Sequence, residues 1–309
     1  MKCFAFLAGL VVPLLGGTTS AAPPITAAAF APDGKQVVLG SQDGIEVRSW
    51  PELKAVSRLK TELSHVHDLA FAPDGKMLLA AGGSPAKSGA VEVLSWPEGK
   101  IVRRLAEHKD LVYRVAWSPD GSCWATASAD CSCRVYAADA GKQVARFEGH
   151  SRPVLALAFL PDGKSIISAG IDQTLQLWEA ASGKHIRTLD NHTAAVNDVA
   201  VCPVTRARDV PVVASAGEDR TVRLWQPTTG RLMRFARLDS VPRAVAWSAK
   251  ENRLLVGCND GNLRVLDFDT LDVIGSKEGL EGRIHTLVPD PKAERDVLLG
   301  GAGAVKLGW

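Results

Sequence analysis

Residues 149–178 read GHSRPVLALAFLPDGKSIISAGIDQTLQLW. Within this stretch, a short apolar segment ends at Phe159, and the turn triplet Pro-Asp-Gly follows at residues 161–163. Residues 175–178 then nearly alternate between apolar and polar side chains and end at Trp178. Such alternation over about four to eight residues is typical of half-buried β-strands. The stretch therefore predicts consecutive short strands that are joined by tight turns.

The triplet recurs at the start of four units. It occupies residues 32–34, 73–75, 119–121 and 161–163, with spacings of 41, 46 and 42 residues. Three later units, which start at Val196, near Pro242 and at Ile284, keep the period but have other residues in the turn. Units of about 40–45 residues are typical of the four-stranded blades of a propeller. We therefore expect an all-β, seven-bladed β-propeller with blades at about 25–63, 64–108, 109–150, 151–192, 193–238, 239–280 and 281–309.

The units also resemble a known family. Gly149-His150, Asp172 and Leu177-Trp178 resemble the WD-repeat motif, and Asn191-His192, Asp219 and Leu224-Trp225 do so as well. The third unit has His108 and Asp130, with Tyr136 in place of the tryptophan. The resemblance covers residues 25–309 and implies the propeller fold, but it does not specify a function.

Two of the units contain a His/Ser/Asp set that could be mistaken for the triad of a hydrolase, and a third contains a His/Thr/Asp set. A catalytic centre is normally single, whereas these sets repeat at the blade period, and no nucleophile elbow is present. The family resemblance implies instead a structural hydrogen-bond relay, in which buried polar groups are paired. Its expected members are His108, Thr126, Asp130 and Tyr136; His150, Ser168, Asp172 and Trp178; and His192, Ser215, Asp219 and Trp225.

One position of the first strand varies widely between units, while we take its neighbours to be apolar. In WD-repeat proteins this position lies near the mouth of the central channel, where side chains point at a docked partner. The expected partner-binding residues at this position are Thr26, His67, Tyr113, Leu155, Asn197, Arg243 and His285. Loops between second and third strands are expected to add Gln42, Glu218 and Asn259 to the same face. Because this set includes two histidines, we expect its binding to change near pH 6.

The N-terminus and the last unit lead to competing expectations. Lys2, an apolar run at residues 4–15 and small residues at 16–22 are typical of a secretory signal peptide, with cleavage expected after Ala21. The last unit has only three strands within the sequence, and in relatives an N-terminal segment often supplies the fourth. Here that segment would be residues 14–19, inside the expected signal. We favour cleavage, a secreted or periplasmic location and a three-stranded last blade.

Other features argue against catalysis and nucleic-acid binding. The 309 residues include 36 basic and 34 acidic side chains, which is too balanced for a protein that binds mainly phosphate backbones. No P-loop, GxGxxG, HExxH or CxxCH motif is present. Cys131 and Cys133 are expected to share a face of one strand as small buried residues, and His65 and His67 to be ordinary rim residues. We expect no catalytic residue, no cofactor, no metal and no membrane span after signal cleavage.

Three functions remain open at this point. The first is a non-catalytic scaffold outside the cytoplasm that binds a protein or peptide at the channel mouth. The second is a propeller enzyme, of the lactonase or quinone-dependent dehydrogenase type, with its site in the central channel. The third is an intracellular WD-repeat adaptor that keeps its N-terminus as the closing strand.

Overall fold

The computed structural model describes residues 22–203, 210–248, 253–293 and 295–309. The expected signal segment, residues 1–21, lies outside these ranges, as do residues 204–209, which were expected to form a turn, and residues 249–252. The described ranges contain 27 β-strands in seven antiparallel sheets, and they contain no helix that could cross a membrane. Six sheets have four strands and the last has three, which confirms the predicted seven-bladed propeller.

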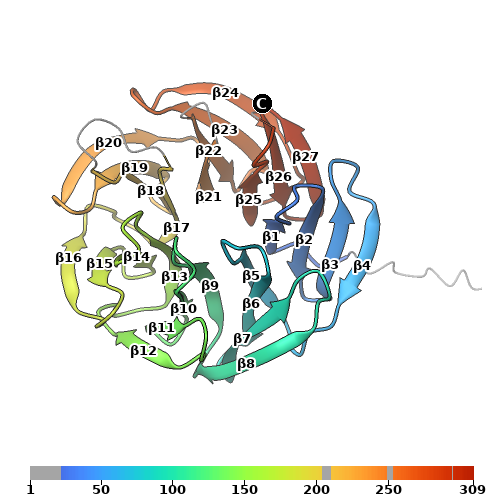
Figure 1. Cartoon of the computed structure of the whole chain (residues 1–309). Coiled ribbons are helices and arrows are strands. Elements are labelled where there is room, and N and C mark those ends of the chain that lie inside the picture. The colour runs from blue at the N-terminus through green and yellow to red at the C-terminus, as the bar shows by residue number, and fades with distance from the viewer. Residues whose placement is uncertain (1–21, 204–209, 249–252, 294) are drawn as a thin grey trace, which may run out of the picture.

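The sheets are arranged in a ring, with the first strand of each nearest the centre (Figure 1). These inner strands are β1 (Ala27–Phe30), β5 (Val66–Phe71), β9 (Val112–Trp117), β13 (Val154–Phe159), β17 (Val196–Val201), β21 (Pro242–Trp247) and β25 (Thr286–Pro289). The second strands are β2 (Gln36–Ser41), β6 (Met77–Ser84), β10 (Cys123–Ser128), β14 (Ser165–Gly170), β18 (Val213–Gly217), β22 (Arg253–Cys258) and β26 (Asp296–Gly300).

The third and fourth strands complete each blade toward the perimeter. The third strands are β3 (Gly44–Ser49), β7 (Ser88–Ser95), β11 (Cys133–Ala137), β15 (Leu175–Glu179), β19 (Thr221–Gln226), β23 (Asn262–Asp267) and β27 (Ala304–Gly308). The fourth strands are β4 (Ala55–Leu59), β8 (Ile101–His108), β12 (Gln143–Phe147), β16 (His185–Leu189), β20 (Arg231–Arg237) and β24 (Val273–Glu278). The second strands are buried on both faces, whereas the fourth strands are largely exposed.

The Pro-Asp-Gly triplets form the turns between first and second strands. In all four, the glycine has a positive φ, between 64° and 72°, which side chains other than glycine rarely adopt. The aspartate carboxylate accepts a hydrogen bond from the backbone N–H two residues later, as Asp33 does from Lys35 at 2.8 Å and Asp74 from Lys76 at 3.0 Å. Each triplet therefore fixes the register between the first and second strands that it joins.

The hydrophobic core lies between blades rather than at the centre of the ring. Buried apolar side chains form seven clusters among the described residues, and each cluster joins two neighbouring blades. In the cluster between blades four and five, for example, Leu177 of β15 packs with Val199 of β17 and Trp225 of β19. Each blade is therefore stabilised by burying its faces against its two neighbours.

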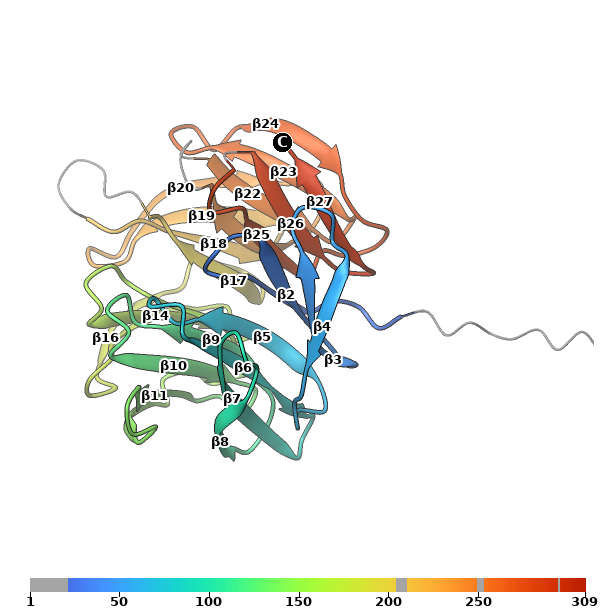
Figure 2. The same cartoon turned by 45° about the vertical axis from the view of Figure 1, so that its right-hand side comes forward.

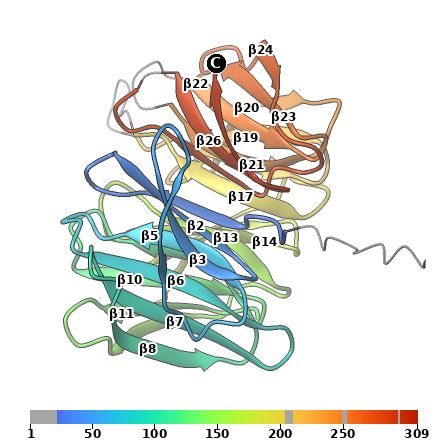
Figure 3. The ribbon, with the colours of Figure 1, turned by 90° about the vertical axis from the view of Figure 1, so that its right-hand side faces the viewer.

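The ring closes where blade seven packs on blade one. Figures 2 and 3 show the blue first blade between the red last blade and the teal second blade. Trp50 Nε1 donates a hydrogen bond to Asp290 Oδ2 at 2.6 Å, and the Ile25 N–H donates to the Gly301 carbonyl at 2.7 Å. Leu298 is fully buried in the cluster between these blades. Within the described ranges, the sheet of blade seven ends at β27 and takes no strand from another part of the chain. Closure thus rests on packing and on individual hydrogen bonds between blades one and seven.

Candidate functional site

A cavity of about 440 Å³ lies at one mouth of the central channel. All seven residues predicted for the variable position line it, one from each blade, and all seven are partly buried. These residues are Thr26, His67, Tyr113, Leu155, Asn197, Arg243 and His285. The aligned position therefore corresponds to one continuous surface, which we call the mouth cavity. Its volume is within the range of ligand pockets, which is roughly 300–1,000 Å³.

Arg243 is held in place on the wall of the mouth cavity. Its guanidinium lies 2.8 Å from Glu218 Oε1, 3.3 Å from Asn197 Oδ1 and 3.4 Å from Asn259 Oδ1. Glu218 and Asn259, both predicted from the loops, therefore reach the cavity through Arg243. Gln42, which was predicted for the same face, is exposed in the turn between β2 and β3 and is not among the residues that line the cavity.

Aromatic rings form another part of the wall. The rings of His65 and His67 stack with centroids 4.3 Å apart, and the His67 ring meets Tyr113 edge-on at 5.3 Å. Burial, together with repulsion from His65 and His285, lowers the pKa of His67 to about 4. The pKa values of His65 and His285 are also lowered, mainly by burial. The expected change near pH 6 therefore moves to lower pH, and these histidines are neutral at pH 7.

Beneath the mouth cavity lies a charged cluster that the sequence analysis missed. Arg114 of β9 contacts Asp198 of β17 directly, and its guanidinium lies 3.8 Å from the Asp68 carboxylate of β5. Asp68 accepts a hydrogen bond from the Val115 N–H at 2.9 Å, and Asp198 accepts one from the Val245 N–H at 3.0 Å. The cluster therefore links blades two, three, five and six across the channel.

This cluster corrects one assumption of the sequence analysis, that the neighbours of the variable position stay apolar. Asp68, Arg114 and Asp198 each follow a variable residue directly, at a register shift of the first strand, and their side chains meet across the channel. Charged side chains are rarely buried unless they are paired. Three charges at equivalent positions of otherwise apolar strands were the signal that predicts such pairing across the ring.

Burial dominates the electrostatics of the charged cluster. Burial raises the pKa of Asp68 to about 6, although Arg114 and two backbone N–H groups oppose that rise. Burial likewise raises the pKa of Asp198, against the attraction of Arg114. The negative charges of both buried carboxylates are thus stabilised by the single guanidinium of Arg114.

The predicted relay residues are connected by hydrogen bonds in blades four and five. In blade four, Trp178 Nε1 donates to Ser168 Oγ at 3.1 Å, and Ser168 Oγ lies 2.8 Å from His150 Nε2. His150 Nδ1 lies 2.8 Å from Asp172 Oδ2. Trp225, Ser215, His192 and Asp219 repeat this arrangement in blade five, with distances of 2.7–2.9 Å.

The proton arrangement of the relay follows from its ends. An indole N–H can only donate, so Ser168 accepts from Trp178 and is free to donate to His150 Nε2. With Ser168 as the donor to Nε2, the other ring nitrogen carries a proton and donates to Asp172 Oδ2. In blade five, burial lowers the pKa of His192. Burial alone would raise the pKa of Asp219, but hydrogen bonds from Thr221 and His192 lower it to about 2. Each carboxylate therefore stays ionised at neutral pH.

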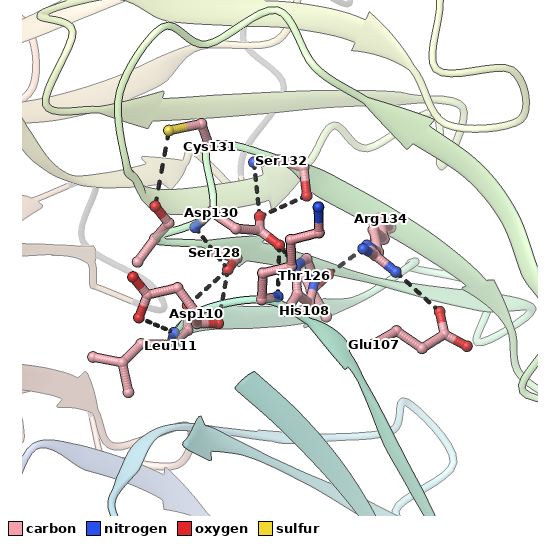
Figure 4. Close-up of polar contacts among 12 residues, drawn as sticks. Glu107, His108, Asp110, Leu111, Thr126, Ser128, Asp130, Cys131, Ser132 and Arg134 are labelled. Carbon is pink, nitrogen blue, oxygen red and sulfur yellow. Dashed lines mark hydrogen bonds and ion pairs between the residues drawn. The ribbon is translucent and has the colours of Figure 1, made fainter. Parts of the chain in front are cut away.

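Blade three departs from this arrangement at its aromatic end. His108 lies 2.9 Å from Asp130 and 2.7 Å from Thr126, as in the other blades (Figure 4). However, the Tyr136 hydroxyl donates to Glu107 Oε2 at 3.1 Å instead of to Thr126. The phenol oxygen projects farther from its strand than an indole nitrogen does, and it therefore passes the threonine. The predicted place of Tyr136 in the relay is wrong, while the other three residues are connected.

The two neighbouring cysteines differ in position. Cys133 starts β11 and is fully buried, but Cys131 lies in the preceding turn with a φ of +68°. The expectation that both share one face of a strand is therefore wrong, because the turn ends only at Ser132. Burial raises the pKa values of both thiols, so neither is activated as a nucleophile. Within the described ranges, no group of three or more His, Cys, Asp or Glu side chains could hold a metal ion.

Comparison with protein families identifies the repeat. The family described as WD domain, G-beta repeat matches residues 99–137, 141–179 and 183–226. Each match begins near the outer strand of one blade and ends at the third strand of the next, so the repeat is out of phase with the blades. A search of curated proteins found no match to the chain. The chain thus contains WD repeats within a seven-bladed propeller.

Proposed function

We propose that this protein is a non-catalytic scaffold that binds a protein or peptide at the mouth cavity, outside the cytoplasm. WD-repeat propellers generally bind proteins or peptides, which supports the general class. The observation that carries the proposal is that seven residues of different chemistry, one from each blade, line a single cavity. Tyrosine and arginine, which dominate binding hot spots, are both among them.

The burial of the His/Ser/Asp sets supports the absence of catalysis. Ser168 and Ser215 are fully buried, and His150 and His192 are 4% and 3% exposed. A nucleophile must reach its substrate, but each serine hydroxyl lies inside a blade between an indole and an imidazole. The same arrangement in two blades, with a close variant in a third, is what a structural role requires.

The scaffold proposal predicts that mouth residues decide capture of a partner. A Tyr113→Ala, Arg243→Ala double variant should lose at least about 90% of the partner that the unchanged protein captures from its native extract, because both side chains belong to the proposed hot spot. Capture is measured by affinity purification followed by mass spectrometry, and folding of the variant by circular dichroism.

The matched control removes an aromatic side chain and an arginine from the outer strand β20. Phe235 is 61% exposed and Arg231 is also exposed, so the Phe235→Ala, Arg231→Ala variant should capture the partner as the unchanged protein does. If the mouth variant folds and captures the same partners, the mouth cavity is not the binding site and the proposal fails.

The location outside the cytoplasm has its own test. Removal of a signal peptide predicts that the mature protein begins at Ala22. Edman sequencing or intact mass of protein purified from its native source identifies the first residue. A mature protein that begins at Met1 would contradict the proposed location and support the intracellular adaptor with a retained N-terminus.

A further inference from the structure

The mouth cavity is lined by three arginines and by no carboxylate among the described residues. The arginines are Arg114, Arg243 and Arg283, and the cavity wall also includes His65, His67 and His285. A cavity with cationic walls and neutral hydrogen-bonding groups attracts anions, especially where water is partly excluded. Only an arginine that is not already paired with a carboxylate has its full charge available to a ligand.

Two of the three guanidinium groups are already balanced by carboxylates. Arg114 lies between Asp68 and Asp198, and Arg243 is paired with Glu218 at 2.8 Å. Arg283 is exposed and forms no ion pair with a described residue. Arg283 is therefore the guanidinium of the cavity wall that no described carboxylate pairs, and Arg243 lies on the same wall.

His285 lines the same cavity as these two arginines. Its pKa is lowered mainly by burial, and then by repulsion from Arg283 and Arg243. Both guanidinium groups thus act on the same point of the cavity wall. At neutral pH the imidazole is uncharged, so it can donate one hydrogen bond to an anion without adding charge.

We propose that this part of the mouth cavity binds a carboxylate, the side chain of an Asp or Glu in an extended acidic segment of the partner, between Arg243 and Arg283. The inference rests on the proposed scaffold function and names the chemistry of its ligand. A single carboxylate matches the single guanidinium that no described carboxylate pairs. A phosphate dianion matches it less well, because Asp68 and Asp198 lie beneath the cavity and would repel a second negative charge. The His67 and Tyr113 rings, which meet edge-on, offer an aromatic surface to the neighbouring residues of the segment.

The test uses a peptide library displayed on phage and selected on the immobilised full-length protein. Selected sequences are synthesised with blocked termini, and each is also made with Asn or Gln in place of its Asp or Glu. Affinities are measured by fluorescence anisotropy for the unchanged protein and for Arg283→Gln, Tyr113→Ala and Arg187→Gln. Arg187 is exposed on β16 and provides the matched arginine control.

The expected result is a selected sequence rich in Asp or Glu. Its amide counterpart and the Arg283→Gln protein should each bind roughly tenfold to a hundredfold more weakly, as loss of a charge-assisted hydrogen bond predicts. Arg187→Gln should bind as the unchanged protein does. A phosphoserine peptide that binds more than about tenfold better than its glutamate counterpart would overturn the assignment to a carboxylate.

Two other outcomes separate this inference from the proposed function. Peptides that lack acidic residues but lose binding in Tyr113→Ala would overturn the carboxylate site and leave the mouth cavity as the binding surface. If no peptide is retained, or if binding is unchanged in both mouth variants, the proposed function fails together with the inference.

Discussion

Replacing Arg114 with leucine is expected to lower the free energy of unfolding by about 3–5 kcal/mol, as loss of one partner of a buried ion pair does. The substitution keeps most of the apolar volume but leaves the Asp68 and Asp198 carboxylates without a positive charge. Both side chains are nearly inaccessible to water, with 12% and 8% of their surface exposed. Urea unfolding followed by tryptophan fluorescence measures the loss, and Arg187→Leu on the exposed strand β16 provides the control.

The pH dependence of this loss tests its electrostatic origin. The pKa of Asp68 is about 6 in the folded protein, above its ordinary value of 3.8. Between these values the folded protein binds a proton that the unfolded chain does not, so stability decreases as pH rises from about 4 to 6. Without Arg114, ionisation of Asp68 costs more, and the loss should be greater at pH 8 than at pH 5. An equal loss at both pH values would show that packing, not charge, explains the role of Arg114.

Replacing His150 with alanine is expected to cost about 3–5 kcal/mol of unfolding free energy, because two buried polar groups lose their partner and a cavity forms. The imidazole connects Ser168 to Asp172, and its side chain is inaccessible to water. The Asp172 carboxylate would keep only bonds from its own turn and from the Ser151 N–H. Thermal and urea unfolding of the purified variant measure the effect.

A second histidine in the same blade supplies the control. His185 is exposed on β16, and its hydrogen-bond partner among the described residues is Thr188 at 3.0 Å. His185→Ala should therefore change stability by less than about 0.5 kcal/mol. If the two alanine variants are equally stable, the relay contributes nothing to the fold, and the chemical role of the His/Ser/Asp and His/Thr/Asp sets would need to be reconsidered.

The fold could be predicted because its signals are local and repeated. A Pro-Asp-Gly triplet specifies its turn through one glycine conformation and one carboxylate hydrogen bond, whatever surrounds it. Seven copies of the period then specify the ring. The three-stranded last blade was also predicted correctly, since it follows from counting the strands before Trp309.

The charged cluster was missed, although the alignment of the blades places its three charges at equivalent positions. The alignment does not show which of these charges meet, and Arg114 and Asp198 do so across the channel although they are 84 residues apart. The prediction that Tyr136 belongs to the relay failed for a different reason. Tyrosine and tryptophan occupy the same place in the repeat, but their polar atoms lie at different distances from the strand, so one donates to Glu107 and the other to a serine.

The last blade consists only of strands from the end of the chain, β25 to β27, and this affects how the ring folds. Every sheet in the described ranges is made of strands that are consecutive in the sequence, so each blade can form from its own short segment. Contacts of this kind have low contact order, and they require little loop-closure entropy. Joining the two ends is different, because the bond from Trp50 to Asp290 spans 240 residues. We therefore expect the blades to form from local contacts, whereas the channel and its mouth require contacts between distant segments, of which the closure between blades one and seven spans the most residues.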